Sequence, residues 1–275
     1  MPELPETETI ARDLDRELRG RTITGIVVRQ PDVLREVSAQ EFSARITGAS
    51  ILASWRRAKL VIIDLSSRDR IVVQPRFTGA LLLSAGPLPE PEARYSTLHA
   101  TLDDERDLHY RDIRRLGTVA LMSPGRFADY VGDLGVEPLD PAFTVAHLSV
   151  LLRGSKQAVK KLLMDQRMVV GIGNIYANEA CWRAGIDPSR RSADVDDAAV
   201  ERLHAGIVSV LTESIAARGT SFRDYRDASG GRGDFQRSLA AYGRGGEPCL
   251  RCGARLVETH AIDGRTTVLC AHCQR

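Results

Sequence analysis

Near its C-terminus the chain reads Cys249-Leu-Arg-Cys252 and, after seventeen further residues, Cys270-Ala-His-Cys273. Each pair can offer two thiolates from one tight turn, and two such pairs complete a tetrahedron around Zn²⁺. The intervening Ile262-Asp263-Gly264-Arg265 resembles a hairpin turn that would return the second pair to the first. Because four thiolates leave no open coordination position, the spacing predicts one structural zinc ion rather than a catalytic one. We favour this interpretation over a redox-active pair of cysteines.

The other end of the chain does not resemble a targeting segment. It begins Met-Pro-Glu-Leu-Pro-Glu, which is acidic and lacks the apolar core of a signal peptide. No apolar run in the sequence approaches the ~18 residues that a membrane span needs. We therefore expect a cytoplasmic protein with no membrane partner, in a reducing compartment where paired cysteines are more often metal ligands than disulfides. The fifth cysteine, Cys181, lies in a predicted helix and is expected to be buried like a small apolar residue.

The distribution of charge is more informative than its sum. The formal net charge of +2 is too small to indicate a nucleic-acid partner by itself. Between Arg218 and Arg275, however, there are ten arginines, six carboxylates and no lysine. Arginine suits bidentate contacts to phosphate, although a solvated basic surface would have the same composition. Together with the zinc hairpin, the arginines make DNA or RNA the leading partner, and a protein-binding zinc ribbon remains the alternative.

The periodicity of apolar residues changes along the chain. An apolar stripe at every fourth residue predicts a helix over residues 6–19, and charges of the appropriate sign lie at its two ends. Short β-type runs follow from Thr22 to about Leu121, and the pattern becomes helical after Pro141. The predicted strands are Ile23–Val28, Leu60–Leu65, Arg70–Val73, Ala80–Leu83, Leu98–Leu102 and Thr118–Leu121, and the later predicted helices are residues 143–152, 157–164, 176–184 and 198–217.

These patterns predict an α+β protein with domains at residues 1–135, 136–240 and 241–275. The first would be a two-layer β-domain, and the second a helical domain with a glycine turn at residues 169–174. Residues 226–238 are polar and rich in glycine, which predicts a mobile loop.

Several separated segments carry a resemblance over the whole chain. In chain order they are Met1-Pro-Glu-Leu-Pro-Glu-Thr-Glu-Thr9, Arg56-Arg57-Ala58-Lys59, Asp112-Ile-Arg-Arg-Leu-Gly117, Leu163-Met-Asp-Gln166, Gly171-Ile-Gly-Asn-Ile-Tyr-Ala-Asn-Glu179, Ala241-Tyr-Gly-Arg244 and the cysteine motif. This collinear set resembles the formamidopyrimidine-DNA glycosylase / endonuclease VIII family. The resemblance implies an N-terminal β-sandwich with flanking helices, a helix–two-turn–helix domain and a zinc finger. It also implies an enzyme that excises oxidised bases from double-stranded DNA and then cuts the strand at the abasic sugar. We expect it to act as a monomer.

The resemblance makes Pro2 the nucleophile, and its chemistry suits that role. Removal of Met1 would expose Pro2 as a secondary α-amine. Such a group titrates at about 8, whereas a lysine side chain titrates at about 10.4, so much more of it is free base at neutral pH. Attack on the sugar C1′ would expel the base and leave a charged iminium, which permits β-elimination of the phosphate. A proline that only stiffens a helix start is the alternative, and the neighbouring Glu3, Glu6 and Lys59 argue against it.

The resemblance also assigns roles to other residues. Glu3 would move protons at the sugar or the leaving base, and Glu6 would cap the first helix and help to orient Pro2. Lys59, expected on a strand, would contact the phosphate next to the lesion, and Arg265 would grip the phosphates that flank the flipped nucleotide. Further DNA contacts are expected from Phe77, His99, Arg114, Lys156, Lys160 and Asn174.

The chain departs from the family where side chains fill the gap left by a flipped base. Phe77 replaces the usual methionine and Leu116 the usual phenylalanine, while Arg114 keeps the family arginine. Each change keeps the bulk that a wedge needs, so we expect base flipping to persist and the reading of the opposite base to change. Other departures are Gln74 and Thr97 in place of histidine, Pro75 after Gln74, and Ile113 in place of proline.

Two features favour the formamidopyrimidine-DNA glycosylase branch. Residues 219–236 resemble that branch's loop over an extruded oxidised purine, and Glu-Leu-Pro at residues 3–5 replaces the Glu-Gly-Pro of the other branch. The predicted substrates are therefore 8-oxoguanine and formamidopyrimidine purines. The same mechanism on oxidised pyrimidines or other lesions is the second hypothesis, and a non-catalytic binder of damaged DNA is the third.

Overall fold

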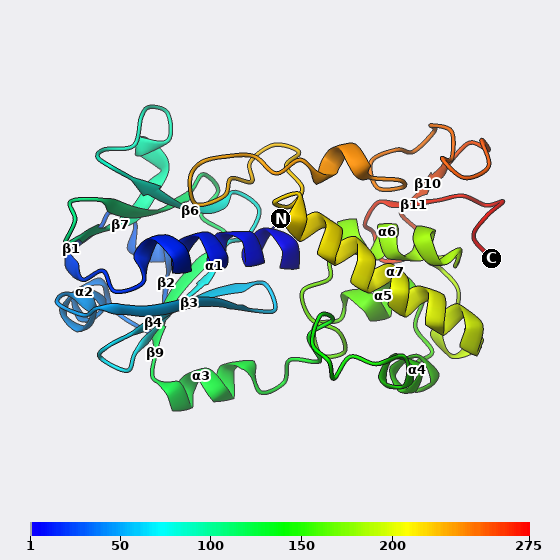
Figure 1. The fold of residues 1–275 in the computed structure, drawn as a ribbon, viewed down its shortest axis with the longest axis horizontal. Helices are drawn as coiled ribbons and strands as arrows, with labels where there is room; N and C mark the ends of the chain where they lie inside the picture. The colour runs from blue at the N-terminus through cyan, green and yellow to red at the C-terminus, as the bar shows by residue number, and fades with distance from the viewer. Residues whose placement is uncertain (1) are drawn as a thin grey trace. The chain divides into compact units, whose positions relative to one another are not determined.

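The computed structural model describes residues 2–275, which divide into two compact units. The first unit comprises the chain up to Asp133 together with Ala217–Gln236, and the second comprises Leu134–Ala216 together with Arg237–Arg275. Met1, whose removal the expected role of Pro2 would require, lies outside the described residues. Figure 1 shows the elements of both units. The first unit thus includes a segment, residues 217–236, that comes from much later in the chain.

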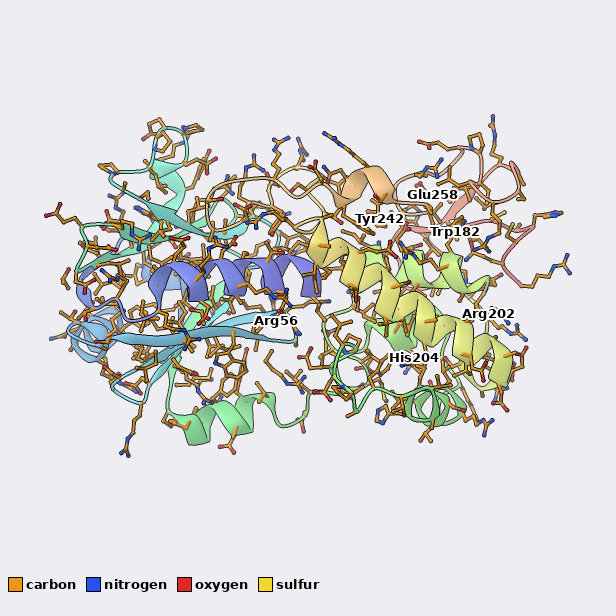
Figure 2. All side chains as sticks on the ribbon, viewed as in Figure 1. Arg56, Trp182, Arg202, His204, Tyr242 and Glu258 are labelled. Atoms are coloured by element: carbon orange, nitrogen blue, oxygen red, sulfur yellow. The ribbon has the colours of Figure 1, made fainter. Side chains whose placement is uncertain are left out.

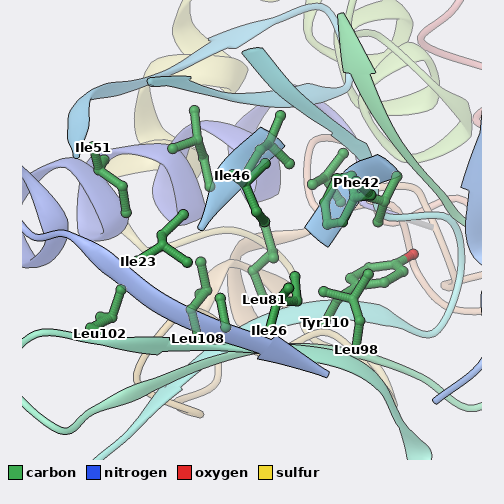
Figure 3. Close-up of a pocket in the computed structure, with 15 residues that line it drawn as sticks. Ile23, Ile26, Phe42, Ile46, Ile51, Leu81, Leu98, Leu102, Leu108 and Tyr110 are labelled. Carbon is green, nitrogen blue, oxygen red and sulfur yellow. The ribbon is translucent and has the colours of Figure 1, made fainter. Parts of the chain in front are cut away.

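Two β-sheets form the layers of the first unit. One has the strand order β1-β7-β8-β6 and is antiparallel, and the other has the order β2-β9-β5-β4-β3 with only β2 and β9 parallel. Side chains such as Ile23, Ile51 and Leu81 fill the space between the sheets (Figure 3). The predicted two-layer β-sandwich is therefore confirmed. Its strands are β1 Ile23–Val28, β2 Leu34–Arg35, β3 Ile51–Arg57, β4 Leu60–Leu65, β5 Arg70–Gln74, β6 Gly79–Ser84, β7 Ser96–Leu102, β8 Asp107–Asp112 and β9 Thr118–Met122.

Helix α1, Leu4–Leu18, packs against β3 and β4. Its stripe of Ile10, Leu14 and Leu18 has no exposed surface, which stabilises the fold by about 2 kcal/mol for each side chain. The helix begins two residues earlier than predicted because a proline is tolerated in the first turn, and because Glu3 and Glu6 form a capping box there.

Two shorter helices, α2 Ala39–Ile46 and α3 Pro124–Val131, also belong to the first unit. The hydroxyl oxygens of Ser38 and Ser123 accept hydrogen bonds from the amides three residues later and so cap their first turns. The sequence patterns did not predict these helices, because eight residues with one or two buried apolar side chains give too little periodicity to detect.

The second unit is helical, as predicted, and ends in a β-hairpin. Helix α6 packs against α5 and α7, and it ends at Gly185, whose φ of 68° is the left-handed conformation that glycine favours. Within residues 2–275, no helix is long and apolar enough to cross a membrane. The elements of this unit are α4 Val145–Arg153, α5 Val159–Met164, α6 Asn174–Ala184, α7 Asp197–Ala216, β10 Val257–Thr259 and β11 Thr267–Leu269.

Three strands of the sandwich, β2, β3 and β8, were not predicted from the sequence. Strand β8 reads Asp-Leu-His-Tyr-Arg-Asp, and five of its six residues are buried. Its polar side chains are buried because each has hydrogen-bond partners: His109 contacts Ser96, Arg111 donates to the Thr78 carbonyl, and Asp112 accepts from the Gly117 amide. A pattern of apolar residues cannot reveal a strand that is buried in this way.

His109 gives the first unit a pH-dependent stability. Burial, together with the neighbouring His99, lowers the pKa of His109 to about 4. The unfolded chain would therefore bind a proton below pH ~6.5 that the folded chain binds only near pH 4. It follows that the free energy of unfolding falls as the pH is lowered through this window.

We expect the wild-type protein to lose about 1 kcal/mol of stability between pH 7.5 and pH 5.5, as measured by urea unfolding. His109→Gln, which cannot take up the proton, should lose less over the same interval. The exposed His147→Gln serves as the matched control and should behave as the wild type does. Equal losses in all three proteins would contradict this origin of the pH dependence.

Candidate active site

The N-terminus is held by the first turn of α1. Pro2 and Glu3 precede the helix and are both buried. The Glu3 amide donates a hydrogen bond to Glu6 Oε2 (2.8 Å), and Glu6 Oε1 accepts from the amide of Thr220 (2.7 Å). A single carboxylate therefore holds the backbone of Glu3, next to Pro2, and the start of the segment at residues 217–236. This connection to Thr220 was not foreseen from the sequence, because 214 residues separate the two positions.

Lys59 lies in the turn of the β3–β4 hairpin and not on a strand, which corrects the expectation. The preceding Ala58 has a φ of 55°, and this left-handed residue turns the chain sharply. Arg56, labelled in Figure 2, donates from Nε to Glu8 Oε2 of α1 (2.7 Å) with only 9% of its side chain exposed. Burial would raise the pKa of Glu8, but Arg56 and Arg12 hold it below its usual value. The ion pair thus fixes the hairpin that carries Lys59 against the helix that begins next to Pro2 and Glu3.

The three predicted gap-filling side chains lie at the surface on two neighbouring turns. Phe77 is 45% exposed and Leu116 is 40% exposed. The guanidinium of Arg114 lies over the ring of Phe77, 4.9 Å from its centroid. The structure therefore brings Phe77 and Arg114 together as a cation–π pair.

A buried carboxylate joins the two turns beneath these side chains. Asp112 Oδ1 accepts from the hydroxyl of Thr78 (2.5 Å) and the amide of Arg114 (3.3 Å), while Oδ2 accepts from the amide of Gly117 (2.8 Å) and the hydroxyl of Tyr110 (3.3 Å). Gly117 is required here, because a Cβ at this position would collide with the Tyr110 hydroxyl. In the sequence, Asp112 was noted only as part of the motif at residues 112–117, and its role in joining the two turns was not predicted.

His99 lies on β7 and is half-buried, with its ring 5.1 Å from that of His109. Its Nδ1 is buried and, among residues 2–275, has no hydrogen-bond partner.

The residues of the second unit fall into two groups. Lys156 is exposed, and the side chain of Arg265 is 60% exposed at the tip of the finger hairpin. Lys160, by contrast, has no exposed surface, and its Nζ donates to Thr267 Oγ1 (2.7 Å) and to the Thr266 carbonyl (3.1 Å). The expected direct contact between Lys160 and DNA is therefore corrected. The buried ammonium group instead holds the finger hairpin through its hydrogen bonds.

Two asparagines of α6 hold the same hairpin. Asn174 Nδ2 donates to the Thr266 carbonyl (3.0 Å), and Asn178 Oδ1 accepts from the amide of Val268 (2.8 Å). Asn178 was not singled out from the sequence, although it belongs to the motif that begins at Gly171. Lys160, Asn174 and Asn178 together fix the hairpin that presents Arg265.

The cysteines fit the predicted zinc site. The sulfur atoms of Cys249, Cys252, Cys270 and Cys273 all lie within 4.8 Å of one another, close to the spacing of four thiolates around one tetrahedral zinc ion. Burial would raise the pKa of Cys249, but the backbone amides of Arg251 and Cys252 lower it, which favours the thiolate that binds metal. Trp182 packs beside this cluster (Figure 2). Cys181 is fully buried in α6, as expected, and burial raises its pKa to about 12.

Known proteins match this chain over its whole length. Family models described as the formamidopyrimidine-DNA glycosylase N-terminal domain, the formamidopyrimidine-DNA glycosylase H2TH domain and the zinc finger found in FPG and IleRS match residues 1–119, 134–226 and 246–275. The formamidopyrimidine-DNA glycosylase of Carboxydothermus hydrogenoformans is 40% identical, with 100% of each chain covered. The chain belongs to the formamidopyrimidine-DNA glycosylase family. It is accordingly an enzyme, a DNA glycosylase, and the predicted helix–two-turn–helix domain and zinc finger are confirmed.

Solved structures agree with the family. The protein of this family from Thermus thermophilus superposes with a TM-score of 0.87 at 33% identity, covering 99% of this chain and 98% of that one. The Lactococcus lactis enzyme in complex with DNA containing an N7-benzyl-Fapy-dG lesion superposes with a TM-score of 0.92 at 30% identity, covering all of both chains. As a member of the formamidopyrimidine-DNA glycosylase family, this chain carries one structural zinc ion, for which the four cysteines are the ligands that fit.

We expect Cys270→Ala to lose bound zinc and to unfold the finger hairpin, because three thiolates and a short hairpin cannot replace the metal's contribution. Metal content by mass spectrometry and affinity for duplex DNA measure the two effects. Cys181→Ala is the matched control and should keep one equivalent of zinc. Zinc retained by Cys270→Ala at full occupancy would show that the ligand set is different.

Proposed function

We propose that this glycosylase excises 8-oxoguanine and formamidopyrimidine purines from duplex DNA with the α-amine of Pro2 as its nucleophile. The observation that carries the proposal is the anchoring of the N-terminus at the first turn of α1 through Glu6. Pro2 nitrogen would form a bond to the sugar C1′ while the bond from C1′ to the base breaks. The base leaves with that electron pair and takes up a proton. Glu3, which is buried next to the amine, is suited to moving protons in this step.

The same covalent bond would serve the strand cleavage. Because Pro2 is a secondary amine, its adduct with the ring-opened sugar is a cationic iminium, which makes the C2′ proton acidic. Removal of that proton expels the 3′-phosphate by β-elimination, and a second elimination expels the 5′-phosphate. Lys59, in its tight turn tied to α1, is proposed to contact a phosphate next to the lesion, and Arg265 to bind the flanking phosphates.

The remaining surface residues are proposed to position the DNA. Phe77, Arg114 and Leu116 would fill the gap left by the flipped nucleotide. Lys156, Asn174 and His99 would contact the DNA backbone, and Lys160 would act through the hairpin that it holds. The proposal also includes three domains at residues 1–135, 136–240 and 241–275, of which the second contributes residues 217–236 to the first compact unit, together with a monomeric state and a cytoplasmic location.

The choice of substrate is supported by the relatives. The enzymes that match over the full chain are formamidopyrimidine-DNA glycosylases. The Lactococcus lactis enzyme forms a complex with DNA that contains an abasic site, and a mutant of that enzyme forms one with DNA that contains Fapy-dG. A panel of duplexes carrying 8-oxoguanine, a formamidopyrimidine or an oxidised pyrimidine would test the choice. Faster excision of the oxidised pyrimidine would overturn it while leaving the mechanism intact.

We expect Pro2→Gly to lose nearly all covalent trapping by borohydride on DNA that carries 8-oxoguanine or an abasic site. Glycine supplies only a primary amine and changes the backbone at the start of the helix. Pro141→Gly, the same substitution at an exposed proline of the second unit, is the control and should be trapped as well as the wild type. Undiminished trapping of Pro2→Gly, or a retained Met1 in fully active protein, would rule out this nucleophile.

We expect Phe77→Ala to slow excision of 8-oxoguanine from duplex DNA by about tenfold, because filling the gap with apolar surface offsets the lost base stacking. Cleavage of an abasic site in single-stranded DNA has no gap to fill and should change little. The exposed Tyr130→Ala is the matched aromatic control. Equal slowing on both substrates would show that Phe77 does not act as a wedge.

A further inference from the structure

The segment at residues 217–236 is closed on itself at its neck. The amide of Asp234 donates to the Ala217 carbonyl (2.9 Å), and the amide of Phe235 donates to the Gly219 carbonyl (3.1 Å). Residues 217–219 and 233–235, which form the neck, approach so closely that a Cβ at Gly233 would collide with the Gly219 carbonyl. The sequence predicted a mobile loop over residues 226–238. In the structure, hydrogen bonds and buried side chains hold most of residues 217–236 against the rest of the first unit.

The body of the segment is part of the sandwich core. Tyr225 and Ala228 belong to the same buried cluster as the sheets, and the Ala228 carbonyl accepts a hydrogen bond from the amide of Leu83 on β6 (2.8 Å). Phe222, in contrast, is 52% exposed, and Arg223 beside it is exposed as well. The surface that could meet an extruded base is therefore short and lies between two anchored parts.

The strongest anchor is an ion triad on helix α1. The Nη2 of Arg218 donates to Asp13 Oδ2 (2.5 Å) and to Asp227 Oδ2 (2.7 Å), and its Nε also donates to Asp227 (3.0 Å). The two carboxylates have only 5% and 3% of their side chains exposed. Asp13 Oδ1 also lies 3.4 Å from Nη2 of Arg16, but Arg218 is the group that joins the two carboxylates, and its removal would leave each buried charge with fewer partners.

The triad joins three places in the first unit. Asp13 lies in the middle of α1, Arg218 in the neck of the segment, and Asp227 in a turn further along it. Asp227 Oδ1 also accepts from the amides of Ser229 (3.1 Å) and Gly231 (2.7 Å), which fixes that turn. Burial would raise the pKa of Asp227, but the hydrogen bonds from Arg218 and Ser229 hold it below its usual value.

Helix α1 therefore contacts both the start of the chain and the segment at residues 217–236. Its first turn holds Glu3 and Thr220 through Glu6, and its third turn holds Arg218 through Asp13. Tyr225 donates from its hydroxyl to the Glu6 carbonyl (3.4 Å), which adds a third contact. Figure 1 shows the segment running beside this helix.

We propose that Asp13, Arg218 and Asp227 are positioning residues. They hold the segment at residues 217–236 at a fixed position relative to the proposed nucleophile, Pro2, at the start of α1. The triad serves the removal of a base, for which an extruded purine must be held, and not the elimination at an abasic sugar, where no base is present. This inference rests on the proposed function, because it gives the segment the lesion base as its ligand.

Asp13→Asn tests the triad with almost no change in shape. It should lower kcat/KM for excision of 8-oxoguanine by about tenfold or more, which corresponds to one lost hydrogen bond to a charged group. Cleavage of a preformed abasic site should stay within about twofold of the wild type. Asp15→Asn is the matched control, because Asp15 lies on the same helix but pairs with Arg19 and the amide of Ser54 instead of the segment. Both activities should be retained in this control.

Two further measurements keep the inference open to refutation. Arg218→Lys retains the charge but cannot bridge both carboxylates, so it should show the same selective loss if Asp13→Asn does not fold. The unfolding midpoint separates positioning from stability. Equal losses of excision and of abasic-site cleavage, or no loss of either in a folded variant, would overturn the inference. Failure of the wild type itself to be trapped on abasic DNA would refute the proposed nucleophile instead.

Discussion

The enzyme's proposed nucleophile is the end of its own chain, and the main physical constraint on the structure is that a chain end must be held still. Termini are usually the least ordered part of a domain, because few contacts restrain them. Here the restraint comes from one buried carboxylate. Glu6 accepts the amide of Glu3 at one oxygen and the amide of Thr220 at the other. The helix that follows is fixed in turn by its fully buried stripe against the sheet. The proposed reactive amine therefore lies at the start of a firmly anchored helix.

Buried polar groups hold the other functional segments in the same way. Asp112 joins the two turns that present Phe77 and Arg114, and Lys160 holds the finger hairpin that presents Arg265. Glu179 of α6 accepts hydrogen bonds from the amides of Ala240, Ala241 and Tyr242, and so fixes the chain that leads to the zinc finger. Each of these groups is expensive to bury alone, and each is satisfied by amides or hydroxyls of the loop that it holds. Specific positioning of loops, more than additional stability, follows from this arrangement.

Sequence patterns predicted some elements well and missed others for identifiable reasons. The zinc ligands, the stripe of α1 and strands such as β1 and β4 carry local signals, namely fixed cysteine spacing and apolar periodicity. Strand β8 carries no such signal, because its buried polar side chains are paired with residues elsewhere in the chain. Lys59 was placed on a strand by the family resemblance, whereas the apolar pattern began that strand at Leu60, and the left-handed turn at Ala58 has no sequence signature. The internal role of Lys160 was missed because burial of a lysine depends on acceptors more than one hundred residues away.

Residue types at fixed local spacing were enough to establish the family, the structural zinc site and the identity of the residues proposed for the chemistry. Only the folded arrangement showed which of those residues face outward and which hold others in place. In the folded structure Lys160 is buried, and Arg114 lies over the ring of Phe77. Residues 217–236 are held on α1 by Asp13 and Glu6. These relations join residues that are distant in the chain, and local periodicity carries no information about such pairs.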